Sequence, residues 1–308
     1  MAAVAVLTTT IDPTAKGTIL TFITPATQGC GMACGYCFID RRGEETRMES
    51  LQPEDYSRFI REAADQHQIA AVTIQGREPL APSSMRWTKA ILETGASVGA
   101  ETGIVTNGLW LQENSALLGE LDCSGVTVSI DADSAVAHDR LRRAPGAWER
   151  AMDGLRTLTS QGGVARIAVN SLYFKNGISR LLDLPDHLAQ AGVKLWSISP
   201  MLRYDKFGQP HASVSNEEWI EAIDLLSQRA ARYGVSVVAD DEFEIHEGAR
   251  ISSAVLRILS RPSGIMRMQP DGRCSFGKEI LKSSSSSKED MFWMPDAGVA
   301  EIMGQMNR

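Results

Sequence analysis

The fold is decided by TILTFITPATQGCGMACGYC, residues 18–37. Its first seven residues are mostly β-branched or aromatic and end at Pro25, which predicts a strand. The glycine-rich segment that follows carries Cys30, Cys34 and Cys37, at spacings of four and three residues. The stretch therefore predicts a strand followed by a loop whose three thiols can converge on one small object.

Strand-like runs alternate with helical patterns along the rest of the chain. Further strands are predicted at residues 70–75, 103–106, 125–130, 166–172, 194–199 and 235–239. Helices are predicted at 53–66, from the Ser83-Ser84 caps to 97, and at 148–161, 179–191 and 217–233. This order predicts an α/β fold with a parallel sheet, a partial (βα)6 TIM-type barrel. A flat doubly wound sheet is the alternative, because periodicity does not separate the two.

The chain divides into three parts on this interpretation. Residues 1–17 form an N-terminal lead-in, 18–239 the partial barrel and 240–308 a C-terminal extension that shapes the substrate side. The extension contains a hairpin pattern that turns at Asp271-Gly272. In a barrel the chemistry lies on loops after the strands, and the cysteine loop follows the first strand.

Composition excludes several classes of protein. The 308 residues are 43% hydrophobic and 22% charged, which fits a folded protein with a large core. The net charge of −7 disfavours nucleic-acid binding through a broad basic surface. No apolar run is long enough for a membrane span, and the N-terminus does not resemble a secretory signal. Five cysteines, three of them within eight residues, predict metal ligation in a reducing cytoplasm and not a disulfide framework.

The spacing of the cysteines favours an iron–sulfur cluster over zinc. A closed zinc site needs a fourth ligand, and His67 lies thirty residues away in a predicted helix. Three thiolates on a [4Fe-4S] cube leave one iron open to a substrate or cofactor. Chance clustering of structural cysteines is the remaining alternative.

The spacing Cys30-x-x-x-Cys34-x-x-Cys37, with Tyr36 before the last cysteine, resembles the radical S-adenosylmethionine (radical SAM) superfamily. The resemblance implies that S-adenosylmethionine chelates the open iron. One electron from the reduced cluster then breaks the S–C5′ bond, and the resulting 5′-deoxyadenosyl radical abstracts a substrate hydrogen.

Two further motifs resemble those of the superfamily at strand ends. Gly76-Arg77-Glu78-Pro79 resembles its Gly-Gly-Glu-Pro motif, with Arg77 in place of the second glycine. The match implies that Glu78 accepts hydrogen bonds from the methionine ammonium group and that Gly76 lies at the cofactor. Asn107, in Thr-Asn-Gly after the third strand, also matches a cofactor position; an ordinary turn is its alternative.

The stretch Ser129-x-Asp131, followed by His138-Asp-x-x-Arg142, resembles peptide-modifying and sulfatase-maturing members. There the serine and the arginine hold the methionine carboxylate, and an arginine fork suits such a partner. A surface position on a charged loop is the alternative for Arg142. Asn170, after the fifth strand, matches a contact to the cofactor ribose.

Loops after the later strands are expected to form the substrate pocket. Ser199 and Met201 are placed to line the adenine or substrate side, and Arg203, Tyr204 and Lys206 are the substrate-binding candidates. A solvated surface is the alternative for the last three.

Two cysteines remain outside the cluster motif. Cys123 precedes the fourth strand and is expected to lie in the core. Cys274 is a candidate catalytic residue that donates a hydrogen atom to a product radical; a buried structural thiol is the alternative. One cysteine in the extension is too few for an auxiliary cluster.

The sequence therefore predicts a cytoplasmic radical SAM enzyme, a lyase or an oxidoreductase. Its expected cofactors are one [4Fe-4S] cluster and S-adenosyl-L-methionine, and its expected electron donor is flavodoxin or ferredoxin. The short lead-in and the cysteine count favour a small sugar or nucleoside as substrate, in antibiotic or other natural-product biosynthesis. Decarboxylation, dehydration and epimerisation are the candidate reactions. A peptide-modifying radical SAM enzyme and a non-catalytic Fe–S protein on the same fold are the alternatives.

Overall fold

The computed structural model describes residues 17–25, 30–37, 51–201, 214–239, 255–257, 264–276, 291–293, 299, 300 and 303. Its strands are β1 Thr18–Phe22, β2 Ile69–Ile74, β3 Glu101–Thr106, β4 Gly125–Ser129, β5 Arg166–Tyr173, β6 Leu195–Pro200, β7 Ser236–Ala239, β8 Val255–Arg257, β9 Gly264–Met268, β10 Arg273–Phe276 and β11 Met291–Phe292. Its helices are α2 Pro53–Gln66, α3 Met85–Ser97, α4 Leu111–Glu120, α5 Ala135–Arg142, α6 Ala147–Gln161, α7 Leu184–Gln190 and α8 Asn216–Ala231, with a 3₁₀ helix η1 Ile178–Arg180. None of these helices is both long and apolar enough to cross a membrane.

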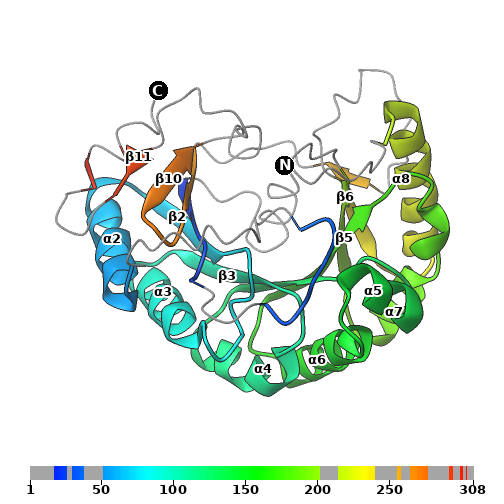
Figure 1. The fold of residues 1–308 in the computed structure, drawn as a ribbon, viewed down its shortest axis with the longest axis horizontal. Coiled ribbons are helices and arrows are strands. Elements are labelled where there is room, and N and C mark those ends of the chain that lie inside the picture. The colour runs from blue at the N-terminus through cyan, green and yellow to red at the C-terminus, as the bar shows by residue number, and fades with distance from the viewer. Residues whose placement is uncertain are drawn as a thin grey trace.

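The described strands form one open sheet, in the order β11-β10-β9-β1-β2-β3-β4-β5-β6-β7-β8. Every neighbouring pair from β9 through β8 is parallel. In Figure 1 the sheet curves into an arc, and α2, α3, α4, α6 and α8 follow the outside of that arc. A doubly wound sheet would carry helices on both faces. The structure therefore confirms the predicted partial barrel, which does not close.

The predicted C-terminal hairpin is present, and it belongs to the barrel sheet. β9 and β10 are antiparallel and are joined by a turn in which Gly272 has a φ of 82°. β9 in turn lies parallel to β1, with Thr18 opposite Gly264 and Phe22 opposite Met268. A segment from the end of the chain thus becomes the neighbour of the first strand.

The predicted helix at 179–191 is wrong as a continuous element. The structure has the single turn η1 and then α7, which starts at Leu184 with Pro185 in its first turn. Proline has no N–H and clashes with the carbonyl of the preceding turn, so it is tolerated at a helix start and breaks a helix interior. Helices α4 and α5 were not predicted.

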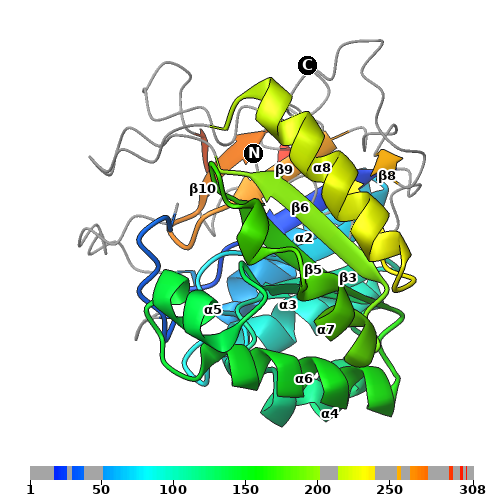
Figure 2. The ribbon, with the colours of Figure 1, turned by 90° about the vertical axis from the view of Figure 1, so that its right-hand side faces the viewer.

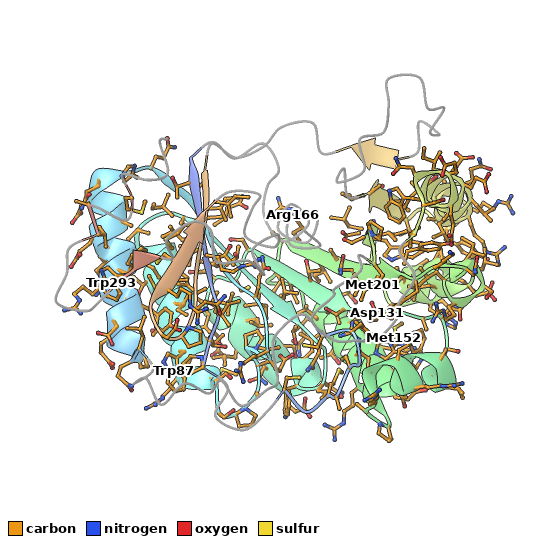
Figure 3. All side chains as sticks on the ribbon, turned by 45° about the horizontal axis from the view of Figure 1, so that its top comes forward. Trp87, Asp131, Met152, Arg166, Met201 and Trp293 are labelled. Atoms are coloured by element: carbon orange, nitrogen blue, oxygen red, sulfur yellow. The ribbon has the colours of Figure 1, made fainter. Side chains whose placement is uncertain are left out.

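The core lies between the convex face of the sheet and the helices. Phe22 of β1 contacts Tyr56 and Phe59 of α2, with ring centroids 5.5 and 6.1 Å apart. Trp293, which follows β11, packs on Phe59 at 5.2 Å and lies beside α2 in Figure 3. Because side chains alternate along a strand, the residues between these core positions face the concave side of the sheet.

Candidate functional site

The cysteine segment, residues 30–37, lies at the carboxyl ends of the parallel strands and beside α5 (Figure 2). The backbone N–H of Ala33 donates to the carbonyl of Arg142 at 3.0 Å, and the Cys30 carbonyl accepts from Asn107 Nδ2 at 2.7 Å. Gly31 has a φ of 71°, and a Cβ there would lie 2.7 Å from Leu109. Glycine is therefore required for the close packing of this segment on the residues that follow β3.

The three thiols fit an iron–sulfur cube better than a single ion. Cys30, Cys34 and Cys37 are free and half-buried. Within the described ranges, no group of three or more His, Cys, Asp or Glu side chains is placed to hold one metal ion. A cube takes its thiolates on separate iron atoms, so its ligands need not meet at one point. Burial raises the pKa of the Cys34 thiol, and the nearby Arg142 cation opposes this rise; a coordinated metal deprotonates a thiol outright.

Glu78 is fully buried at the end of β2 and organises the turn after β3. Its Oε1 accepts from Thr106 Oγ1 at 2.7 Å and from the Leu80 N–H at 3.0 Å, and its Oε2 accepts from the Asn107 N–H at 2.7 Å. Since a carboxylate has about four acceptor positions, one on Oε2 remains for the predicted ammonium contact. Burial raises the pKa of Glu78 to about 7, against the lowering effect of these hydrogen bonds.

The backbone at Arg77 accommodates the replacement of the second glycine of Gly-Gly-Glu-Pro. Gly76 and Arg77 both have a left-handed backbone, with φ of 75° and 48°. The conformation that suits glycine is thus kept although the side chain is not glycine, at a cost of roughly 1 kcal/mol. The predicted role of Gly76 at the cofactor stays a prediction.

Glu78→Ala is expected to loosen the cysteine segment, because the Asn107 turn links Glu78 to the Cys30 carbonyl. The variant leaves three buried donors without an acceptor, so we expect the free energy of unfolding to fall by about 2–4 kcal/mol. Less iron should be retained per chain after reconstitution. Urea unfolding of the cluster-free protein and iron analysis measure the two effects.

The loss of unfolding free energy in Glu78→Ala should also depend on pH. The pKa of Glu78 lies at about 7 in the folded protein against 4.5 for a free side chain. Between pH 4.5 and 7 the folded state therefore binds more protons than the unfolded state. The stability that comes from protonated Glu78 is lost as the pH rises through 7. The difference between wild type and Glu78→Ala should narrow by about 2 kcal/mol from pH 5 to pH 8. Glu93→Ala, at an exposed position of α3, is the control; equal behaviour of the two variants would contradict the role of Glu78.

Asp131, directly after β4, is the second organising carboxylate. It is completely buried, accepts hydrogen bonds from the Tyr36 hydroxyl and from the Leu172 N–H at 2.9 Å, and forms an ion pair with Arg142 Nη2 at 2.6 Å. The Arg142 cation lies near the Cys34 thiol, where it opposes the rise in pKa that burial causes, and the guanidinium is 5.7 Å from the centre of the Tyr36 ring. Asp131 thus connects the cysteine segment to β4, β5 and α5.

The alternative of a surface position for Arg142 is wrong, because the residue is the buried last residue of α5. The helix ends there since Arg143 adopts a left-handed conformation with φ of 51°. Although Asp131 neutralises the guanidinium, Arg142 Nε is buried without a hydrogen-bond partner. The predicted contact of Arg142 with a methionine carboxylate stays a prediction.

Three polar side chains form a row across the concave face. Ser129 of β4 pairs in register with Asn170 of β5, and Asn170 with Ser197 of β6. Their neighbours Val128, Val169 and Trp196 belong to the outer core, so this row faces inward. Asn170 Oδ1 and Ser197 Oγ are buried without a hydrogen-bond partner. Buried polar groups are nearly always paired, so these atoms fit a polar ligand such as the predicted cofactor.

Of the remaining predicted residues, Met201 lies at the site and Cys274 does not. Met201 is buried against Tyr36 and Phe174, next to the cysteine segment. Figure 3 shows Met201 on the same side of the sheet as Asp131. Cys274 is not brought to this site. It lies opposite Met268, on the outer face of β10, and burial raises its pKa to about 12. This position matches the alternative of a structural thiol. Arg203, Tyr204 and Lys206 lie outside the described residues.

Sequence reasoning did not single out four further residues of the concave side. Thr21 and Thr73 hydrogen-bond through their hydroxyls at 3.0 Å, and Arg267 Nη2 lies 3.5 Å from Gln75 Oε1, with both residues buried. Alternating polar positions in β1 and β2 were a usable signal for the threonines. The sequence contains no such signal for Arg267, because its place in the site depends on the pairing of β9 with β1, which is far away in the sequence.

Comparisons with known proteins agree with this geometry. Residues 24–176 match the model of the Radical SAM superfamily, whose members use a [4Fe-4S] cluster and S-adenosylmethionine. A curated relative from Methanopyrus kandleri, described as a probable GTP 3′,8-cyclase, is 29% identical over 187 residues, which are 60% of this chain and 58% of that protein. The chain therefore spans less than two thirds of the length of this relative.

Solved structures show the same fold at low identity. Streptococcus suis SuiB bound to precursor peptide SuiA superposes with a TM-score of 0.66 at 14% identity, over 92% of this chain and 64% of that chain. A structure described as native anSMEcpe with bound AdoMet gives a TM-score of 0.65 at 15% identity, over 94% and 82%. At these identities the likeness concerns the fold alone.

Proposed function

Because this chain belongs to the radical SAM superfamily, we propose that it cleaves S-adenosylmethionine reductively and abstracts hydrogen from a small polar metabolite, a sugar or a nucleoside. The observation that carries the proposal is the placement of Cys30, Cys34 and Cys37 beside the inward row of Ser129, Asn170 and Ser197. The thiols for a cluster lie at the carboxyl ends of the strands, and the unpartnered polar atoms of Asn170 and Ser197 lie on the concave face of the same sheet.

The residues of the chain divide the work as follows. Cys30, Cys34 and Cys37 hold the cluster, which when bound supplies the electron that converts S-adenosylmethionine into methionine and a 5′-deoxyadenosyl radical. Glu78 binds the methionine ammonium, and Arg142 its carboxylate.

The cofactor is oriented by residues at four strand ends. Ser129 and Asn170 bind its polar groups from β4 and β5, and the backbone at Gly76 and Asn107 approaches it after β2 and β3. Tyr36 and Met201 contribute apolar surface next to the cysteines. This enclosed setting limits side reactions of a radical with solvent.

The substrate proposal rests on the lining of the concave side. Hydroxyl and amide groups recur there, on Thr21, Thr73 and Gln75, and the cation of Arg267 lies among them. Such groups suit a polyhydroxylated metabolite better than an apolar one. We further propose a lyase or oxidoreductase reaction in natural-product biosynthesis, with flavodoxin or ferredoxin as the electron donor.

The test is anaerobic reconstitution with iron and sulfide, followed by dithionite and S-adenosylmethionine and mass spectrometry for 5′-deoxyadenosine. The expected result is one [4Fe-4S] cluster per chain and formation of 5′-deoxyadenosine, increased by the correct substrate. Deuterated sugars and nucleosides, with deuterated peptides as the comparison, then identify the hydrogen donor by deuterium transfer. Transfer from a peptide alone would replace the substrate proposal. A cluster without any cleavage across the panel would favour a non-catalytic Fe–S protein.

A further inference from the structure

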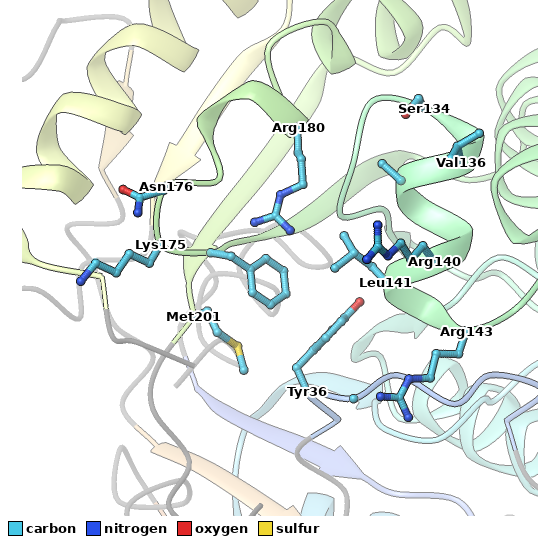
Figure 4. A pocket seen from close by; sticks show the side chains of 13 residues that line it. Tyr36, Ser134, Val136, Arg140, Leu141, Arg143, Lys175, Asn176, Arg180 and Met201 are labelled. Atoms are coloured by element: carbon cyan, nitrogen blue, oxygen red, sulfur yellow. The ribbon is translucent and has the colours of Figure 1, made fainter. Parts of the chain in front are cut away.

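A surface depression of about 720 Å³ lies beside the cysteine segment (Figure 4). Gly35 and Tyr36 form one wall, α5 forms a second, and the segment after β5 forms a third. Tyr36, Phe174 and Met201 are buried at its base. The ligands Cys34 and Cys37 immediately flank Gly35 and Tyr36, so this is a place where the segment that holds the cluster meets the surface.

The lining of the depression is cationic. Arg140 and Arg143 come from the end of α5, and Lys175 and Arg180 from the segment after β5. Among the residues that the structure describes, no acidic side chain lines the depression, and none of the four cations forms an ion pair with another described residue. The chain as a whole has a net charge of −7, so this is a local reversal of its charge.

The depression also presents apolar surface at its rim. Val136 of α5 is 83% exposed, which makes it the most exposed large apolar residue of the described chain. The Arg180 guanidinium lies 5.0 Å from the centre of the Phe174 ring. An apolar patch among cations suits a partner surface that carries carboxylates around an apolar centre.

The exposure of the cations favours a protein over a small anion. Arg140, Arg143 and Lys175 are exposed, and Figure 4 shows Arg140 and Arg180 pointing into the space between α5 and the segment after β5. Flexible, solvated side chains orient a small ligand poorly but attract a charged macromolecule over a distance. Nucleic acid is disfavoured, because the rest of the acidic chain would repel it.

We propose that this depression, lined by Arg140, Arg143, Lys175 and Arg180, is the docking surface for an acidic one-electron donor protein of the flavodoxin or ferredoxin type. The proposal rests on the proposed function, which requires one electron from outside for each cleavage. The donor is oxidised by one electron and the cluster is reduced by one, and no covalent bond forms between the two proteins. Gly35 has no side chain to separate them; a Cβ there would lie 3.2 Å from Arg143.

The test compares a charge-reversed patch with a charge-reversed control. The patch variant is Arg140→Glu with Lys175→Glu; the control is Arg61→Glu with Lys89→Glu, at exposed positions of α2 and α3. Binding of an acidic flavodoxin to cluster-free protein is measured by calorimetry at low and high salt. We expect the Kd to rise about tenfold or more in the patch variant at low salt and by less than about twofold in the control, with the difference reduced at high salt.

A second readout separates docking from catalysis. The reconstituted patch variant should form 5′-deoxyadenosine as fast as wild type with dithionite, and about tenfold more slowly with the reduced flavodoxin at low salt. Unchanged flavodoxin binding in the patch variant would overturn the proposal. Equal losses with both reductants would also overturn it, because the cations would then serve S-adenosylmethionine or the substrate. Failure of wild type with dithionite would instead contradict the proposed function, and the calorimetry would still decide on docking.

Discussion

Cys34→Ala is expected to abolish cluster retention and the formation of 5′-deoxyadenosine. Changing a group that merely supports a metal ligand costs about 10–100-fold in affinity or activity, so removing a ligand should cost more than about 100-fold. Cys34 is the central cysteine of the three, and the Arg142 cation lies near its thiol. Iron and sulfide analysis, the visible absorbance of the reconstituted protein and mass spectrometry measure the result.

Cys123→Ala is the matched control for this prediction. Cys123 is 1% exposed and lies in the outer core, just before β4. Its loss should lower stability modestly and leave the iron content and 5′-deoxyadenosine unchanged. Cys274→Ala is a second control, because Cys274 lies on the outer face of the sheet. A Cys34→Ala protein that kept the iron content of the Cys123→Ala protein would contradict the assignment of the cluster ligands.

The strands were predictable because their signal is local. Each predicted strand from 18–24 to 235–239 overlaps an observed strand of the barrel, since runs of β-branched residues bounded by glycine, proline or polar turns favour buried strands. Helix α2 begins at Pro53 as predicted, because proline is favoured in the first turn. These features depend on residues close together in the sequence.

The helices α4 and α5 were not predictable in the same way. Both are short, with ten residues in α4 and eight in α5. Short helices gain little from intrinsic propensity and form because tertiary packing holds them. The place of β9 beside β1 was hidden for a related reason, since a pairing between distant segments leaves no periodic signal.

The candidate site was predictable by position but not by interaction. The motif residue Glu78 does follow β2, and Arg142 ends α5 next to the cysteine segment. The sequence did not show that Asp131 binds both Tyr36 and Arg142, because burial and partner choice arise only when β4, α5 and the cysteine segment come together. A motif names residues, whereas their hydrogen bonds follow from the packing.

Asp131→Asn is expected to be the most destabilising conservative change at the site. Asp131 is completely buried, and the Arg142 side chain is only 10% exposed. Removing the negative charge leaves the guanidinium buried and uncompensated, so we expect the free energy of unfolding to fall by about 3–5 kcal/mol. Urea unfolding of the cluster-free protein measures this. Iron retention should fall as well, because the single amide oxygen of asparagine cannot accept from both the Tyr36 hydroxyl and the Leu172 N–H.

Asp153→Asn tests whether the size of this effect comes from burial. Asp153 Oδ1 lies 2.7 Å from Arg156 Nη1, close to the 2.6 Å between Asp131 Oδ2 and Arg142 Nη2. The side chains of Asp153 and Arg156 are, however, about half exposed. An exposed pair contributes about 0–1 kcal/mol, so the control should lose little. Adding Arg142→Leu to Asp131→Asn should restore part of the stability but not the iron retention, because the cation beside the Cys34 thiol is then absent. If Asp131→Asn and Asp153→Asn lost the same small amount, Asp131 would not be what anchors the cysteine segment to the barrel.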